Sequence, residues 1–128
     1  MLDRFPVFAV LPSSDLERAR LWFHDHLSMD PTQSDPGGLW YSCADGTWLT
    51  VTRSAYAGTA QNTAASFQVT DIARVMTEMS ARGVVFEDYD LPGFSTVDGV
   101  FRMGRYTAAW FKDADGNTIE ISEVEAEE

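Results

Sequence analysis

The alternation of hydrophobic and polar positions predicts a strand, a helix and a hairpin in the first half of the chain. Residues 5–11 form a short apolar run that is typical of a buried strand, and Pro12 ends it. Residues 15–27 carry apolar side chains at helical spacing, and Ser14 with Glu17 forms the capping box that starts this helix. A strand at residues 39–44, a tight turn at residues 45–46 and a return strand at residues 47–53 complete this half.

The same order of elements returns after a polar, glycine-containing stretch at residues 54–63. A strand over residues 64–69 leads to a helix that is capped by Asp71 and ends at Gly83, where glycine suits the left-handed conformation. Further strands are expected at residues 84–86, 100–103, 106–111 and 117–122, with a long loop at residues 90–99.

This repeated pattern predicts an α+β fold of two βαβββ modules. The segment Asp15-Leu16-x-Arg18 recurs as Asp71-Ile72-x-Arg74 at the start of the second helix. One module alone would leave a sheet face uncovered, so the two must pair, and we expect a curved mixed sheet around a cleft with the helices outside. The expected organisation is one domain over residues 1–122, with module one at 1–53, a linker at 54–63 and module two at 64–122, followed by an acidic tail at 123–128.

Charge and apolar content exclude several classes of partner. The formal net charge is -11, and an acidic surface repels nucleic acid and anionic membranes. No apolar run approaches the roughly 20 residues that span a bilayer, and the first residues lack the pattern of a secretory signal. Cys43 is the one cysteine, so no disulfide can form within the chain, and a cytoplasmic location is expected.

Two phrases of the chain point to a known family. They are Leu11-Pro12-Ser13-Ser14-Asp15-Leu16-Glu17-Arg18-Ala19-Arg20 and Ala109-Trp110-Phe111-Lys112-Asp113-Ala114-Asp115-Gly116-Asn117-Thr118-Ile119-Glu120. With the order of elements, they make the chain resemble the vicinal oxygen chelate superfamily, which includes glyoxalases, extradiol dioxygenases and bleomycin-resistance proteins. Ala114 stands where the family pattern usually has proline, a change that affects the stiffness of the turn.

The resemblance also locates the places where metal-using members carry their ligands, two on each module. The equivalent positions here are Phe8, Leu49 or Thr50, Ala65 or Ala64, and Glu120. Only Glu120 matches a ligand residue, whereas a divalent metal needs about three or four protein ligands. His24 and His26 do not replace the others, because residues two apart on a helix point in different directions. We therefore expect no metal and no other cofactor.

Without a metal set, the chain is most similar to the bleomycin-resistance branch. That resemblance implies a homodimer that binds and sequesters a small-molecule drug and has no catalytic residues. Aromatic side chains stack on planar ligands and attract cations, so the expected ligand is an aromatic or cationic natural product. The candidate ligand-binding residues are Phe8, Trp40, Trp48, Thr50, Phe67, Phe94, Met103, Trp110 and Glu120.

Several alternatives stay open at the level of sequence. If Glu120 faces the cleft, Thr118 and Ser122 share its side of the strand. Its carboxylate then either accepts a hydrogen bond from a ligand or pairs with an arginine, Arg102 or Arg105. The loop at residues 90–99 either closes over a ligand through Phe94 or simply packs.

Two other functions compete with sequestration. One is a glyoxalase- or dioxygenase-like enzyme that uses Glu120 as a base or as a single retained ligand. The other is an accessory domain with a vestigial cleft. The sequence also leaves open whether the modules pair within one chain or swap between chains.

Overall fold

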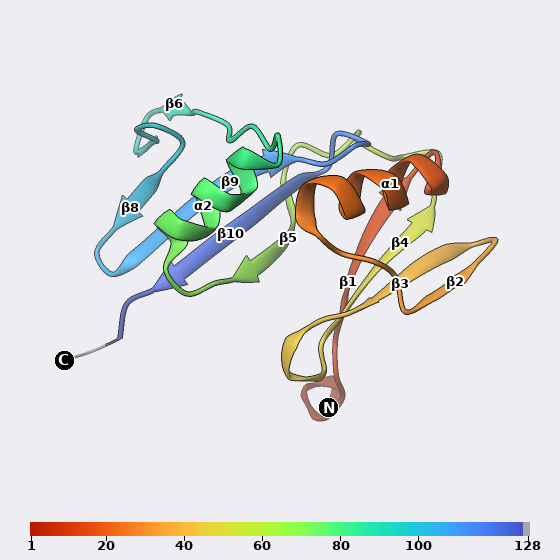
Figure 1. The fold of residues 1–128 in the computed structure, drawn as a ribbon. Helices are drawn as coiled ribbons and strands as arrows, with labels where there is room; N and C mark the ends of the chain where they lie inside the picture. Colours follow the sequence, from red (N-terminus) through yellow and green to blue (C-terminus); the bar gives the residue numbers. More distant parts are fainter. Residues whose placement is uncertain (127–128) are drawn as a thin grey trace.

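The structure, a computed structural model, describes residues 1–126 (Figure 1). A 3-10 turn, η1 (Leu2–Arg4), precedes a four-stranded sheet with the strand order β1-β4-β3-β2. β1 pairs with β4 in parallel, and the other pairs are antiparallel. The elements of this first module are β1 (Ala9–Ser13), α1 (Leu16–Leu27), β2 (Gln33–Asp35), β3 (Gly38–Ser42), the 3-10 turn η2 (Ala44–Gly46) and β4 (Trp48–Arg53).

The second module repeats this topology with the strand order β5-β10-β9-β8. β5 is again parallel to the last strand of its module, and the remaining pairs are antiparallel. Its elements are β5 (Thr63–Gln68), α2 (Ile72–Ala81), a small hairpin of β6 (Asp90–Leu91) and β7 (Phe94–Ser95), β8 (Phe101–Met103), β9 (Tyr106–Lys112) and β10 (Thr118–Val124). The expected α+β fold of two βαβββ modules is confirmed.

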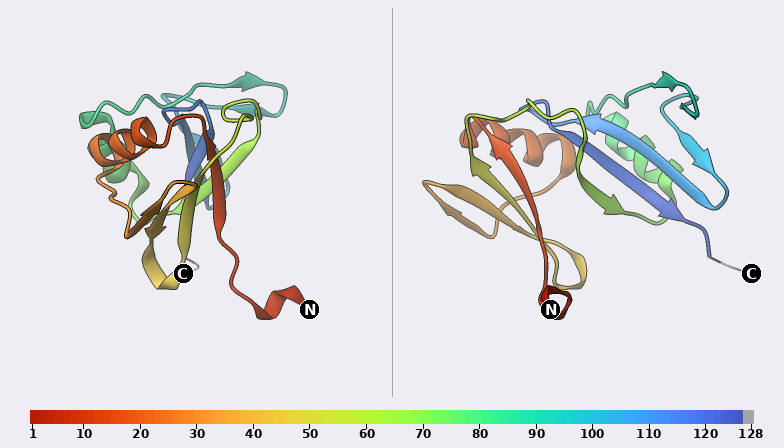
Figure 2. Two further views of the ribbon diagram at one scale, coloured as in Figure 1. Left: turned by 90° about the vertical axis from the view of Figure 1, so that its right-hand side faces the viewer. Right: turned by 180° about the vertical axis from the view of Figure 1, so that it is seen from behind.

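Both helices lie on the same side of the sheets, and the core lies beneath them (Figures 1 and 2). Ile119 and Ile121 of β10 are almost fully buried in this core, together with Phe23 of α1. Strand alternation therefore turns Thr118, Glu120 and Ser122 to the opposite side, as expected from the sequence. We call that opposite side of both sheets the helix-free face.

The two modules are joined where β1 lies beside β5 and where the last hairpin turn meets the first module. Asp115 in that turn accepts hydrogen bonds from the Ser14 amide at 2.9 Å and the Ser14 hydroxyl at 3.0 Å. The side-chain amide of Asn117 donates to the Pro12 carbonyl at 2.8 Å. The turn of module two is thus bound to module one of the same chain.

The start of the chain differs from expectation in two ways. β1 runs from Ala9 to Ser13 rather than over residues 5–11, and so it includes Pro12. Proline is tolerated there because β1 is an edge strand of its sheet. The N-cap of α1 is Asp15, whose carboxylate accepts from the Arg18 amide at 3.1 Å, because the hydroxyl of the expected cap, Ser14, bonds to Asp115 instead.

Differences also occur in the connections between strands. Residues 84–86 make only an isolated bridge from Phe86 to Phe111, and β2 lies in a segment for which no strand was predicted. The long loop at residues 90–99 contains the β6–β7 hairpin.

The expected acidic tail begins inside a strand. β10 continues to Val124, and Glu123 accepts hydrogen bonds from the amides of Asp71 at 2.7 Å and Ile72 at 3.1 Å. Glu123 therefore caps α2, whereas Asp71 makes no side-chain capping bond. The tail residues Glu127 and Glu128 lie outside the described residues. Among the described residues, no helix is long and apolar enough to cross a membrane.

Candidate functional site

Three aromatic side chains cluster on the helix-free face of the first module. Trp40 on β3 and Trp48 at the start of β4 have ring centroids 6.3 Å apart, and Phe8 lies 5.3 Å from Trp40. Phe8 is 43% exposed and Trp48 is 39% exposed, although both are large and apolar. Thr50, paired with Trp40 across the sheet, is buried and donates its hydroxyl hydrogen to the Leu39 carbonyl. We call Phe8, Trp40 and Trp48 the first-module aromatic cluster.

Two cavities adjoin this cluster and share Phe8 and Trp48. One, of about 640 Å³, also contains Trp40, Gln33 and Asp35. The other, of about 540 Å³, extends across to module two, where it reaches Ser66 on β5 and is bordered by Asp45. The charged side chains that line these cavities are Asp35 and Asp45, both acidic. The cavities therefore combine aromatic walls with negative charge.

A second aromatic cluster covers the helix-free face of module two. The β6–β7 hairpin places Phe94 over the sheet, 4.7 Å from Phe101 and 5.2 Å from Trp110 between ring centroids. Tyr89 lies 5.8 Å from Trp110 on another side. Met103, at the end of β8, is 66% exposed beyond this cluster. The hairpin thus packs onto the sheet through aromatic contacts.

Glu120 lies directly opposite Trp110 in the β10–β9 ladder, and two hydroxyl groups bind its carboxylate. The Ser66 hydroxyl donates to one oxygen at 2.5 Å, and the Tyr106 hydroxyl donates to the other at 2.7 Å. Burial, with the hydrogen bond to Glu120, raises the pKa of Tyr106 to about 12, so this hydroxyl keeps its proton. The carboxylate is thus held by neutral donors.

These hydroxyls were not the partners expected for Glu120. An arginine was one of the two partners left open by the sequence, but Arg102 pairs with Thr107, on the opposite side of the sheet from Glu120. The guanidinium of Arg105 donates to the Glu125 carbonyl at 3.0 Å. Tyr106 precedes Trp110 by four residues in the same strand, and residues an even number apart in a strand face the same side. Alternation along β9 could therefore have identified Tyr106 as a neighbour of Glu120.

The positions equivalent to metal ligands do not fit a divalent metal. Leu49 and Ala65 are buried in the core, so Thr50 and Ala64 are the alternatives left at those two places. Phe8 and Ala64 have no side-chain donor atom, and the Thr50 hydroxyl already donates to a carbonyl. Within residues 1–126, no group of three or more His, Cys, Asp or Glu side chains is arranged to hold a metal ion.

The structure places all but one of the candidate ligand-binding residues on the helix-free face of one module or the other. Phe8, Trp40, Trp48 and Thr50 lie on the helix-free face of module one, and Phe94, Met103, Trp110 and Glu120 lie on that of module two. Phe67 instead pairs with Ile121 and packs against the core on the helix side, although it also lines the cavity that extends to module two. A register shift in the β5–β10 ladder precedes this pair, and the sequence does not reveal it.

Comparison with solved structures shows which fold this is. A glyoxalase/bleomycin resistance protein from Catenulispora acidiphila matches with a TM-score of 0.70 and 22% identity, covering 94% of this chain and 99% of that one. The antibiotic binding protein TnmS3 from a Streptomyces species matches with a TM-score of 0.70 and 19% identity, covering 94% and 96%. The chain has the vicinal oxygen chelate fold.

Enzymes share this vicinal oxygen chelate fold. A lactoylglutathione lyase from Agrobacterium tumefaciens matches with a TM-score of 0.68 and 15% identity, covering 91% of this chain and 92% of that one. No protein-family profile matches the sequence, and no curated protein matches it either. At these identities the likeness establishes the fold, and function must be argued from the site.

Proposed function

We propose that this protein binds and sequesters a small aromatic, cationic natural product on its helix-free face, without a metal. One observation carries the proposal: exposed aromatic rings line two adjoining cavities whose charged lining residues are Asp35 and Asp45. An aromatic face attracts a cation, and a carboxylate nearby adds to that attraction. Cavities of this size fall within the roughly 300–1,000 Å³ typical of small-molecule sites.

Glu120 supports the same chemistry on module two. Its carboxylate accepts one hydrogen bond at each oxygen, whereas an ionised carboxylate offers about four acceptor sites. It can therefore still accept a hydrogen bond from a positively charged group of the ligand. The net charge of -11 favours the approach of cations.

Antibiotic resistance by sequestration is the role we propose for this binding. The likeness to TnmS3, an antibiotic binding protein, supports it. We also propose that the protein acts as a homodimer in which a second copy covers part of the helix-free face. The exposure of Val10 at 51% and Met103 at 66% supports an apolar partner surface there.

Titration with ethidium, a planar aromatic cation, tests the proposal. We expect saturable binding that quenches tryptophan fluorescence and that weakens roughly tenfold in Asp35→Asn, because a nearby charge and an aromatic cation interact by about 1–2 kcal/mol. Asparagine keeps the Oδ1 atom that accepts from the amides of Gly37 and Gly38, so the turn survives this substitution. Tyr56→Ala, at a 76% exposed aromatic residue outside the cavities, is the control and should bind normally.

Two results would overturn this function. If the protein bound neither ethidium nor any of a panel of aromatic cationic antibiotics saturably, the sequestration function would be rejected and an accessory domain with a vestigial cleft would be favoured. Stoichiometric zinc, iron, manganese or nickel in the purified protein, lost in Glu120→Gln, would favour the glyoxalase- or dioxygenase-like enzyme instead.

A further inference from the structure

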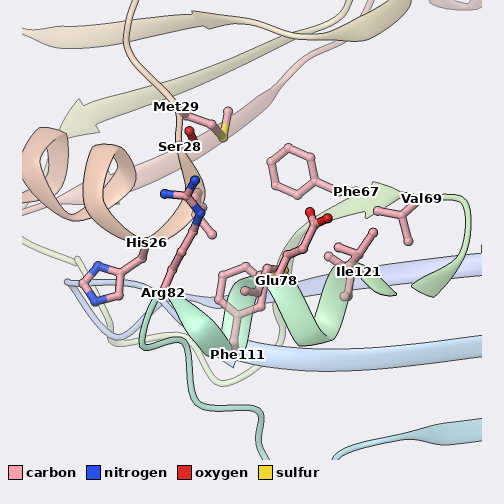
Figure 3. Close-up of a pocket in the computed structure, with 12 residues that line it drawn as sticks. His26, Ser28, Met29, Phe67, Val69, Glu78, Arg82, Phe111 and Ile121 are labelled. Atoms are coloured by element: carbon pink, nitrogen blue, oxygen red, sulfur yellow. The ribbon is translucent and has the colours of Figure 1, made fainter. Parts of the chain in front are cut away.

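A separate cavity of about 430 Å³ lies between the two helices, on the other side of the sheets from the aromatic clusters (Figure 3). Its floor is apolar and comes from three strands of module two. The floor residues are Phe67 of β5, Val69 just after that strand, Phe111 of β9 and Ile121 of β10. Met29, which follows α1, and Met79 of α2 close its sides. We call this cavity the interhelical pocket.

Two charged side chains extend into the interhelical pocket: Glu78 of α2 and Arg82, the C-cap of that helix (Figure 3). They are one helical turn apart but are not paired with each other, because Glu78 accepts from Arg74 at 3.4 Å. Among the described residues, no ion pair or side-chain hydrogen bond of Arg82 is found. The guanidinium of Arg82 is therefore free to bind an anion at the edge of an apolar surface.

His26 borders the pocket in a defined orientation. Its Nδ1 lies 3.1 Å from the carbonyl oxygen of Trp22, and a carbonyl can only accept, so Nδ1 carries the hydrogen. The ring stacks on Trp22 with centroids 4.7 Å apart, and Trp22 also stacks on Phe111 at 6.3 Å. Trp22 thus contacts two residues that line the pocket, although it is on neither aromatic cluster.

We infer that the interhelical pocket binds an amphipathic monocarboxylate, with its apolar chain on the floor and its carboxylate on Arg82. The planar guanidinium matches a carboxylate with two parallel hydrogen bonds. A single negative charge fits best, because Glu78 is close by and the chain has a net charge of -11, which both disfavour a dianion. This site takes a ligand of opposite charge to the one proposed for the aromatic cavities, with which it shares one lining residue, Phe67.

Titration with decanoate, followed by amide chemical shifts, tests this inference. We expect saturable shifts at His26, Met29 and Ile121, which line this pocket alone, with affinity at least tenfold weaker in Arg82→Gln. The control Arg53→Gln removes the same net charge at an exposed position outside the pocket and should bind decanoate normally. Glu78→Gln should bind more tightly, because it removes the neighbouring negative charge.

Three outcomes would overturn the inference: no saturable shifts with decanoate, equal affinity for decanol and decanoate, or no effect of Arg82→Gln. Asp35→Asn should leave decanoate binding unchanged, and ethidium should not displace decanoate. Failure of the interhelical site therefore leaves the proposed function untouched, and failure of the proposed function leaves this site untouched.

Discussion

The Asp115 carboxylate and the Arg18 guanidinium lie 2.9 Å apart, although 97 residues separate them in the chain. Asp115 is in the last hairpin turn of module two, and its side chain is only 2% exposed. Arg18 is in the first turn of α1 and also donates to the Ser14 hydroxyl at 3.1 Å. This contact explains the acidic turn near the end of the chain: it fastens one module to the other.

Loss of this carboxylate should destabilise the whole fold. We expect Asp115→Ala to lower the free energy of unfolding by about 2–3 kcal/mol, because Ser14 and Arg18 lose a charged acceptor whose side chain is itself buried. Urea denaturation measures this change. Asp30→Ala, which removes an exposed pair with His24, is the control and should have little effect. Equal stability of the two variants would contradict the role of Asp115 as a link between modules.

The same residue should make stability depend on pH in the acid range. Burial alone would raise the pKa of Asp115, but hydrogen bonds from Ser14 and Arg18 outweigh it and hold the pKa below the ordinary value of 3.8. Its contribution is therefore complete above that value and is lost as the pH falls through the lowered pKa. Urea unfolding at a series of pH values should show that the free energy of unfolding falls less steeply with decreasing pH in Asp115→Asn than in the wild type. Identical slopes would contradict this assignment.

The buried acid beside it should act in the opposite direction. Burial raises the pKa of Asp113 despite hydrogen bonds from Asn117. Ionisation of Asp113 therefore costs some stability as the pH rises above its ordinary value, which partly offsets the gain from Asp115. A titration of the two carboxyl groups by carbon-13 chemical shifts should find Asp113 titrating above Asp115, and the reverse order would contradict this account.

Glu123 should stabilise α2 from the neighbouring strand. We expect Glu123→Ala to cost about 1 kcal/mol, the typical value of a helix N-cap, because the amides of Asp71 and Ile72 lose their acceptor. Thermal unfolding measures this change, and Glu125→Ala, at an exposed residue two positions further along the chain, is the control. If both glutamates proved equally dispensable, Glu123 would belong to the acidic tail after all.

The hydroxyl of Tyr41 should be dispensable for stability. It is the one fully buried side-chain polar atom without a hydrogen-bond partner among the described residues. Burial raises the pKa of Tyr41 to about 12, and its ring stacks on Phe23 at 5.2 Å. Tyr41→Phe keeps the stacking and should be neutral or about 1 kcal/mol more stable in urea denaturation. A clear loss of stability would show that this hydroxyl has a partner in solution.

Local patterns predicted the elements of this fold well, because they depend on near neighbours. Alternation along β10 placed Ile119 and Ile121 in the core and Thr118 and Ser122 on the other side, as observed. Capping was harder to predict, because the partners are distant in sequence. The Ser14 hydroxyl donates to Asp115 and so does not cap α1. Glu123, rather than the side chain of Asp71, caps α2.

The candidate site was predictable in its residue types and not in its arrangement. The aromatic residues and Glu120 were visible in the sequence, whereas the pairing of Glu120 with Ser66 depends on the register between β5 and β10. The same register places Phe67 on the helix side. Asp35 and Asp45 read as turn residues, and only the cavities show that they border the first-module aromatic cluster.

Calorimetric titration of ethidium into protein freed of metal with a chelator is the decisive test of metal-independent binding. We expect saturable binding with the same affinity before and after chelation, and no gain in affinity when zinc, manganese or nickel is added. Binding that disappears on chelation and returns with one of these metals would contradict the claim that the helix-free face holds its ligand without a metal.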